Sequence, residues 1–155
     1  MGYGLSEVSV VGVGQTAFTR ACGVSIKELC FEAFKEAFED AGNLQLQDID
    51  GSIICSAPEY DKQRSPAGAI AEYLGFNPKP TFYVEAICAS STSGIRAAYG
   101  LIKSGLNEVV AVLGFQKMSE LSSLEVQERM GRGADITWES PFGLSMPAGY
   151  ALFAR

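Results

Sequence analysis

The chain has 155 residues, of which 47% are hydrophobic and 19% are charged, and its formal net charge is -6. This length supports one domain with a real hydrophobic core and is too short for two ordinary domains. Because the net charge is negative and no local basic patch is visible, the sequence argues against a nucleic-acid partner.

The four cysteines at positions 22, 30, 55 and 88 form no CxxC pair and lie within helix or strand patterns. This spacing indicates reduced thiols of a cytoplasmic protein rather than disulfides or zinc ligands. The chain has no histidine, so no metal site is expected. No basic leader with an apolar core and no apolar window of ~18 residues is present, which predicts no membrane partner. Residues Met1 to Ser6 match a myristoylation pattern, but we favour a simple lead-in to the first strand.

The first predicted element is a buried strand over Glu7 to Val13. It ends in two glycines, Gly12 and Gly14, which together with Ala17 satisfy the dinucleotide fingerprint G-x-G-x-x-A. That fingerprint requires a helix to begin at the glycines. Residues 15–24 show no helical period, so a small dinucleotide-binding module is the third of our hypotheses for the function.

Strands and helices then alternate along the chain. A capping box of Ser25 and Glu28 predicts where the first helix begins, and its charged face should be solvated. The other predicted elements are a strand over Ile49 to Ser56, a short helix from Pro66 to Leu74, a strand over Thr81 to Ile87, a helix up to Lys103, a strand over Glu108 to Phe115, and a helix begun by Ser145. This alternation predicts an α/β layered domain with a mainly parallel sheet. The pattern dissolves between residues 116 and 140, which predicts a long irregular loop.

Cys88 lies at the junction between the strand that ends at Ile87 and the following helix. A helix N-terminus stabilises a thiolate and favours nucleophilic attack. The small residues Ala89, Ser90 and Ser91 should leave room for a ligand to approach the sulfur. Since free cysteine is often buried, a packed thiol with no chemical role is the alternative on position alone.

The segment around Cys88 resembles the nucleophilic-cysteine segment of thiolases, above all the archaeal and sterol-carrier-protein types. Other segments resemble parts of the same family and occur in the family's order. The four segments are Glu85 to Gly94, Val10 to Thr16, Gly114 to Ser119 and Pro141 to Ala148. The resemblance extends over the whole chain, although such thiolases are more than twice as long.

The resemblance implies the fold of a thiolase half-domain, a three-layer α/β/α sandwich with a mainly parallel sheet. The family's fifth strand, which is antiparallel and lies between the first and fourth strands, is missing from this sequence. We therefore expect a thiolase-like N-terminal core over residues 1–115, an irregular loop over residues 116–145, and the start of a truncated fourth helix over residues 146–155. The slot for the fifth strand should be open or filled by another segment.

The resemblance also implies a function, an acyltransferase of the acetyl-CoA C-acetyltransferase type that works through an acylated Cys88 in Claisen condensation or thiolysis. A coenzyme A thioester would be the substrate, no cofactor would be bound, and Arg129 and Arg132 would contact the coenzyme A phosphates. The family's histidine and second cysteine come from the C-terminal half, so we expect the chain to be inactive alone, and whether it is an enzyme by itself stays open. The alternative function is a non-catalytic subunit or remnant that uses the thiolase scaffold for assembly. Expected partners are a second copy, paired near Thr81 to Ile87, or a complementing C-terminal half.

Overall fold

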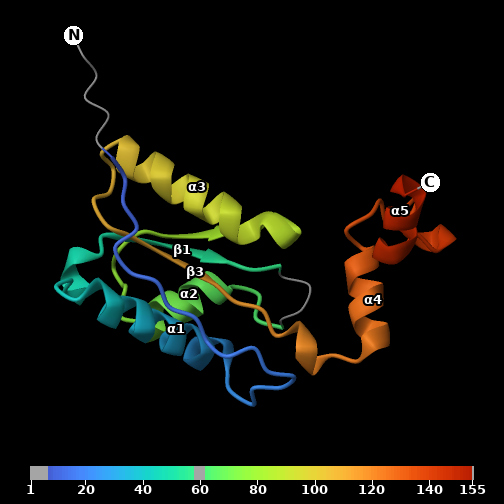
Figure 1. The fold of residues 1–155 in the computed structure, drawn as a ribbon, viewed down its shortest axis with the longest axis horizontal. Helices are drawn as coiled ribbons and strands as arrows, with labels where there is room; N and C mark the ends of the chain where they lie inside the picture. Colours follow the sequence, from blue (N-terminus) through green and yellow to red (C-terminus); the bar gives the residue numbers. More distant parts are fainter. Residues whose placement is uncertain (1–6, 58–61, 155) are drawn as a thin grey trace, which may run out of the picture.

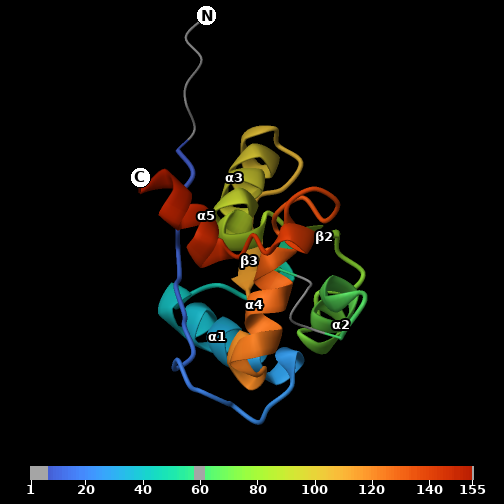
Figure 2. The same ribbon diagram turned by 90° about the vertical axis from the view of Figure 1, so that its right-hand side faces the viewer.

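The computed structural model describes residues 7–57 and 62–154 of the chain. A three-stranded sheet lies between helices on both of its faces, and a helical arm projects from one end of this core, as Figure 1 and Figure 2 show. The strands are β1 (Gly51–Cys55), β2 (Thr81–Val84) and β3 (Val110–Gly114). The α-helices are α1 (Ile26–Ala41), α2 (Pro66–Tyr73), α3 (Ser90–Lys103), α4 (Ser123–Gly131) and α5 (Met146–Phe153).

The sheet is parallel, with the strand order β2-β1-β3. Strand β1 is central and buried along its whole length, as its continuous apolar run predicts for a strand covered on both faces. In register, Ile53 of β1 lies opposite Phe82 of β2 and Val112 of β3. Because strand side chains alternate between faces, Ile53 and Ile54 enter two different cores.

Each face of the sheet has its own core. Ile54 packs with residues of α1 and α2, including Cys30 and Ile70, whereas Ile53 packs with Cys55 of β1 and Ala98 of α3. The arrangement is therefore a three-layer α/β/α sandwich with a parallel sheet, which confirms the fold class expected from the sequence.

Asp50 links the starts of β1 and β3. Its carboxylate accepts hydrogen bonds from the backbone N–H groups of Glu108 (2.7 Å) and Val109 (3.1 Å) and from the side-chain amide of Asn107 (3.2 Å). Burial raises the pKa of this carboxyl, but the hydrogen bonds outweigh that effect and lower the pKa overall. An ionised carboxylate thus holds the two strands in register at the end of the sheet opposite Cys88.

The capping box at the first helix is confirmed. The Ser25 hydroxyl accepts from the backbone N–H of Glu28 (3.3 Å), and the Glu28 carboxylate accepts from the backbone N–H of Ser25 (2.8 Å). These hydrogen bonds satisfy two N–H groups that an α-helix leaves without internal partners at its start.

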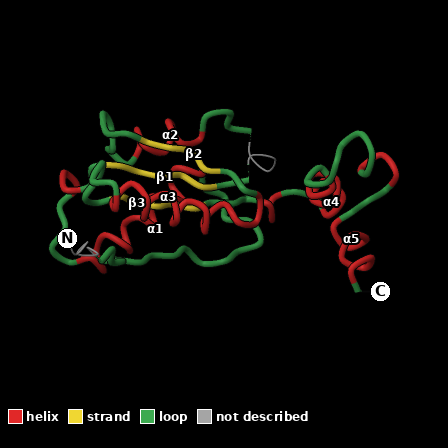
Figure 3. The backbone as a smooth tube through the Cα atoms, turned by 90° about the horizontal axis from the view of Figure 1, so that it is seen from above, coloured by secondary structure: helices red, strands yellow, loops and turns green. Residues whose placement is uncertain are grey.

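The strand predicted over Glu7 to Val13 is wrong, because residues 7–13 form no strand in the structure. This segment runs beside α1 instead, as Figure 3 shows from above. The backbone N–H groups of Val13 and Gln15 donate to the carboxylates of Asp40 (2.9 Å) and Glu36 (2.7 Å). The resemblance to thiolases places the fifth strand beside the first, and within residues 7–57 and 62–154 no strand pairs with the outer edge of β3. Residues 7–13 therefore have no neighbouring strand with which to form the backbone hydrogen bonds of a sheet.

The glycines of the dinucleotide fingerprint also have a different role. A Cβ atom on Gly12 or Gly14 would overlap a backbone carbonyl oxygen of α1, that of Ala37 or of Ala33. The two glycines thus let the segment approach the middle of α1, far from a helix N-terminus that could hold a phosphate. The myristoylation pattern at residues 1–6 lies outside the described residues.

The expectation of an irregular segment over residues 116–145 is wrong in part, because it contains α4. Ser122 and Glu125 form a capping box at the start of this helix. The signal was present in the sequence as Ser122-x-x-Glu125, three residues apart. The final helix begins as expected, with the Ser145 hydroxyl accepting from the backbone N–H of Ala148. Over the part of the chain that the structure describes, no helix has the length and apolar character needed to cross a membrane.

Candidate active site

Cys88 lies in a short 3-10 turn, η3 (Ile87–Ala89), between β2 and the first residue of α3. Its side chain is exposed. The sulfur therefore lies at the carboxyl end of a parallel sheet and beside a helix start, the position in α/β folds where ligands bind. The alternative of a packed, inert thiol does not agree with this exposure.

The turn that carries Cys88 is strained at the preceding residue. Ile87 has a φ of 51°, in the left-handed region that a β-branched residue rarely adopts. The Glu85 carboxylate accepts a hydrogen bond from the backbone N–H of Ile87 (2.6 Å). Strain of this kind costs of order 1–3 kcal/mol and persists only where the surroundings hold it.

The Ser90 side chain stabilises this strained turn. Its hydroxyl accepts from the backbone N–H of Ala86 (2.9 Å) and donates to the backbone carbonyl of Ile87 (2.7 Å). The Ser90 residue is 4% exposed, and both hydrogen bonds are partly buried. The sequence predicted that Ser90 is small enough to leave room for a ligand, and in the structure its hydroxyl also closes the turn around Cys88. Its identity as a hydroxyl residue was visible in the sequence, but its two partners were not.

Helix α3 packs very closely on the sheet just after this turn. A Cβ atom on Gly94 would overlap the sulfur of Cys55 and would lie 3.4 Å from Ile53 and Val112. The absence of a side chain at Gly94 thus decides how near α3, and with it Cys88, lies to the ends of β1 and β3.

A cavity of about 440 Å³ opens beside Cys88. One side of it comes from the turn around Cys88, and the other comes from α4, the loop after α4 and the start of α5. Arg129 and Arg132 line this cavity together with Cys88, so the structure brings all three predicted site residues to one place. Arg132 also forms an ion pair with Glu128 (2.8 Å).

The other cysteines differ from Cys88 in their surroundings. Burial raises the pKa of the Cys30 thiol to about 12 and also raises the pKa of the Cys55 thiol. Cys22 is half-buried, and its sulfur lies 3.6 Å from the Glu120 carboxylate. Because the thiolate is the nucleophilic form, Cys30 and Cys55 are poor nucleophiles at neutral pH.

Residues 7–57 and 62–154 contain no cluster of cysteine, aspartate and glutamate side chains that could hold a metal ion. The groups suited to an anionic ligand at this site are the two arginines of the cavity.

The sequence model of the family described as thiolase, N-terminal domain, matches residues 8–148. The chain belongs to the thiolase family. This thiolase domain is 35% identical over 153 residues to an acetyl-CoA acetyltransferase of Methanocaldococcus jannaschii, covering 97% of this chain and 38% of the relative. It is 32% identical to the acetyl-CoA acetyltransferase of Methanothermobacter thermautotrophicus, covering 97% of this chain and 39% of that relative. The thiolase domain thus spans less than two fifths of either relative.

Solved structures agree with the family. The thiolase domain superposes on a chain of an Ltp2-ChsH2(DUF35) aldolase with a TM-score of 0.68 at 26% identity, covering 94% of this chain and 36% of that one. It also superposes on a 3-oxoacyl-[acyl-carrier-protein] synthase III from Aquifex aeolicus with a TM-score of 0.56 at 28% identity, covering 63% of this chain and 32% of that one. The fold is therefore shared by several enzymes that differ in their named activities.

Proposed function

We propose that this domain is the acyl-accepting half of a thiolase-type acyltransferase of the acetyl-CoA C-acetyltransferase class. Cys88 would take an acyl group from a coenzyme A thioester. The single observation that supports this most is the exposed sulfur at a strained, hydrogen-bonded turn that opens onto a cavity with two arginines.

The proposed step is a thioester exchange. The Cys88 sulfur attacks the acyl carbonyl carbon, the bond between that carbon and the coenzyme A sulfur breaks, and coenzyme A leaves with the proton of the cysteine thiol. No oxidant or metal is needed. The chain contains no histidine to act as a general base. A positioned base contributes typically 10²–10⁴-fold to such steps, so full condensation would require the histidine and second cysteine that the resemblance assigns to the C-terminal half.

Incubation of the chain with acetyl-CoA, followed by proteolysis and mass spectrometry, tests the proposed step. We expect the acetyl group on Cys88, with Cys30 and Cys55 unmodified because their thiols are buried and protonated. The Cys88→Ala variant should carry no acetyl group. Labelling spread over all four cysteines, or absent from Cys88, would refute the proposed function.

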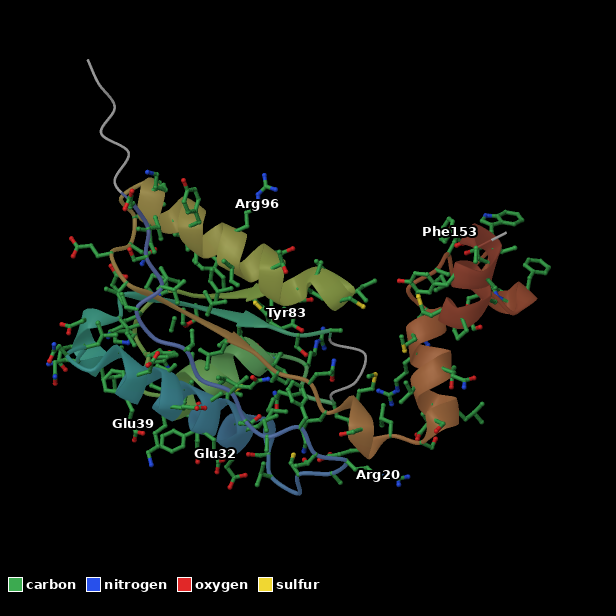
Figure 4. All side chains as sticks on the ribbon, viewed as in Figure 1. Arg20, Glu32, Glu39, Tyr83, Arg96 and Phe153 are labelled. Atoms are coloured by element: carbon green, nitrogen blue, oxygen red, sulfur yellow. The ribbon has the colours of Figure 1, made fainter. Side chains whose placement is uncertain are left out.

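The same labelling experiment tests the arginines. We propose that Arg129 and Arg132 contact the phosphates of coenzyme A, since guanidinium groups suit phosphate oxygens. The variants Arg129→Gln and Arg132→Gln should lower Cys88 labelling by acetyl-CoA about tenfold, the worth of one charge-assisted hydrogen bond. Labelling by S-acetyl-N-acetylcysteamine, which has no phosphate, should not change. Arg96→Gln is the matched control, because Arg96 points outward from α3 in Figure 4. An equal loss with both reagents would exclude phosphate contacts.

Assembly is the second candidate function, and the edge strand β2 favours it. Phe82 of β2 is 48% exposed, and β2 lies at the edge of the sheet, a position where a strand can pair with a strand of another chain. We propose a homodimer formed through β2. Light scattering should give twice the chain mass of 16.5 kDa, and Phe82→Lys should give the monomer mass. Val10→Lys, at a residue that is 80% exposed on the N-terminal segment, is the control. A monomeric wild-type chain would remove this proposal.

A further inference from the structure

Glu85 brings a carboxylate to the cavity beside Cys88. Among the described residues that line this cavity, Glu85 is the acidic one, and Arg129 and Arg132 are the basic ones. The other lining residues are apolar or carry hydroxyl, amide or thiol groups, and three of them are methionines, Met118, Met130 and Met146. Glu85 is exposed and lies three residues before Cys88. The structure thus places one carboxylate in the same cavity as the reacting sulfur.

One oxygen of the Glu85 carboxylate has a fixed partner. Glu85 Oε1 accepts a hydrogen bond from the backbone N–H of Ile87, with 2.6 Å between nitrogen and oxygen. Hydrogen bonds between N–H groups and carbonyl oxygens are commonly ~2.9–3.0 Å long, whereas bonds to a charged oxygen are shorter and roughly twice as strong. The bond between Glu85 and Ile87 belongs to this short and strong class.

This bond acts on the residue that directs Cys88. The N–H of Ile87 belongs to the peptide group before its Cα atom, and the Ile87 carbonyl belongs to the peptide group after it. Glu85 binds the first of these groups, and the Ser90 hydroxyl binds the second (2.7 Å). Because φ and ψ describe the rotation of the two planar peptide groups about the Cα atom, the two side chains together fix the φ of 51° at Ile87.

A rotation at Ile87 would move the sulfur. Helix α3 begins at Ser90 and packs on the sheet through Gly94, so the chain from Ser90 onward cannot follow such a rotation. Cys88 and Ala89 are the residues between Ile87 and this fixed helix, and they would absorb the change. Loss of the bond from Ile87 to Glu85 would therefore displace the Cys88 side chain from the cavity.

We propose that Glu85 is a positioning residue for the acylation of Cys88. Its carboxylate acts through the Ile87 N–H and keeps the Cys88 sulfur at the cavity, without contacting the acyl group and without taking the thiol proton. This inference rests on the proposed thioester exchange, whose bonds are unchanged: the acyl carbon passes from the coenzyme A sulfur to the Cys88 sulfur, and the thiol proton leaves with coenzyme A. In this role the acceptor oxygen of residue 85 matters, and its ability to hold a proton does not.

The test is the rate of Cys88 acetylation by acetyl-CoA, measured by mass spectrometry over a range of concentrations in the full chain and two variants. Glu85→Ala removes the acceptor oxygen and should lower the maximal rate about tenfold, which corresponds to the loss of one charge-assisted hydrogen bond. The acetyl-CoA concentration that gives half of the maximal rate should change by less than about twofold, because the contacts to coenzyme A remain. Glu85→Gln keeps an acceptor oxygen, although a neutral one, and should recover a maximal rate within about threefold of the wild type.

Asp48→Ala is the matched control. The Asp48 carboxylate also accepts a hydrogen bond from a backbone N–H, that of Gln45 (2.7 Å), but it lies before the start of β1, at the end of the sheet opposite Cys88. This variant should acetylate Cys88 at the wild-type rate. If Glu85→Gln is as slow as Glu85→Ala, the charge or the proton of Glu85 matters and the positioning role is overturned. A Glu85→Ala rate equal to that of the wild type also overturns the inference and leaves the proposed function standing.

Amide hydrogen exchange gives a second readout that requires no reaction. The Ile87 N–H should exchange about tenfold faster in Glu85→Ala than in the wild type, with Glu85→Gln between them. The amides of Ile53 and Val112 in the sheet should be unchanged, which shows that the variants are folded. If acetyl-CoA does not label wild-type Cys88, the proposed function fails, and the exchange of the Ile87 amide decides separately whether Glu85 holds the turn. Equal exchange of this amide in the wild type and in Glu85→Ala overturns the inference.

Discussion

The Gly94→Ala variant should be about 2 kcal/mol less stable than the wild type, although alanine is normally the better helix residue. Alanine in place of glycine inside a helix stabilises by about 1 kcal/mol. At Gly94, however, the new Cβ would overlap the sulfur of Cys55, a residue that is 1% exposed. Overpacking of this kind typically costs ~1–3 kcal/mol and moves the backbone. Urea unfolding followed by circular dichroism measures the change.

The Gly100→Ala variant on the same helix is the matched control. Apart from the neighbouring backbone of α3 itself, no atom lies within 4 Å of a Cβ at Gly100, so this variant should be more stable by ~0.5–1 kcal/mol. Opposite signs for the two variants are the distinguishing result. In the background of Cys55→Ala, which removes the overlapped sulfur, Gly94→Ala should cost less than it does alone. A stabilising Gly94→Ala would mean that α3 can move away from the sheet freely, and the close packing described above would be wrong.

The Ser90→Ala variant should lower the rate of Cys88 acylation about tenfold and the stability by ~1–3 kcal/mol. It removes the hydroxyl that bridges the Ala86 N–H and the Ile87 carbonyl, and the two lost hydrogen bonds, at ~0.5–1.5 kcal/mol each, have this cost. Without the bridge, Ile87 can relax from its φ of 51°, and Cys88 then moves out of its place beside the cavity. Mass spectrometry of Cys88 labelling by acetyl-CoA gives the rate.

Two control variants distinguish a role of Ser90 in positioning Cys88 from a role in stability alone. Ser104→Ala removes a similar hydroxyl-to-carbonyl bond, to Leu101 (2.9 Å), at the exposed far end of α3, and should change stability by no more than ~0.5 kcal/mol. Ser90→Thr keeps the hydroxyl and should recover most of the labelling rate. If Ser90→Ala loses stability but labels Cys88 as fast as the wild type, Ser90 has only a packing role.

Local sequence signals predicted most of the secondary structure. The first helix begins at its capping box, the last begins after Ser145, and β1, β2 and β3 differ from their expected ranges mainly at the ends. These features depend on residues a few positions apart, so a short window of sequence contains the relevant interactions. Helix α4 was missed although its signal, Ser122 and Glu125, is equally local.

The errors over the N-terminal segment have a different cause. An apolar run such as Val8 to Val13 has the composition of a strand, but a strand also needs a neighbour with free hydrogen-bonding groups. In the structure the carboxylates of Glu36 and Asp40 accept hydrogen bonds from two backbone N–H groups of this segment. The sequence showed these carboxylates only as a solvated helix face.

The sequence by itself determined the family, the alternation of strands and helices, and the position of Cys88 between a strand and a helix, because each of these is carried by neighbouring residues. Only the tertiary structure decided that Ser90 closes the turn, that Gly94 sets the distance between α3 and the sheet, and that three methionines meet Cys88 across a cavity. These are contacts between residues far apart in the chain or between atoms whose directions depend on the backbone path. The contacts of Gly94 and of the methionines exist only once the layers have packed, and the Ser90 bonds, although local in sequence, depend on the backbone path of the turn.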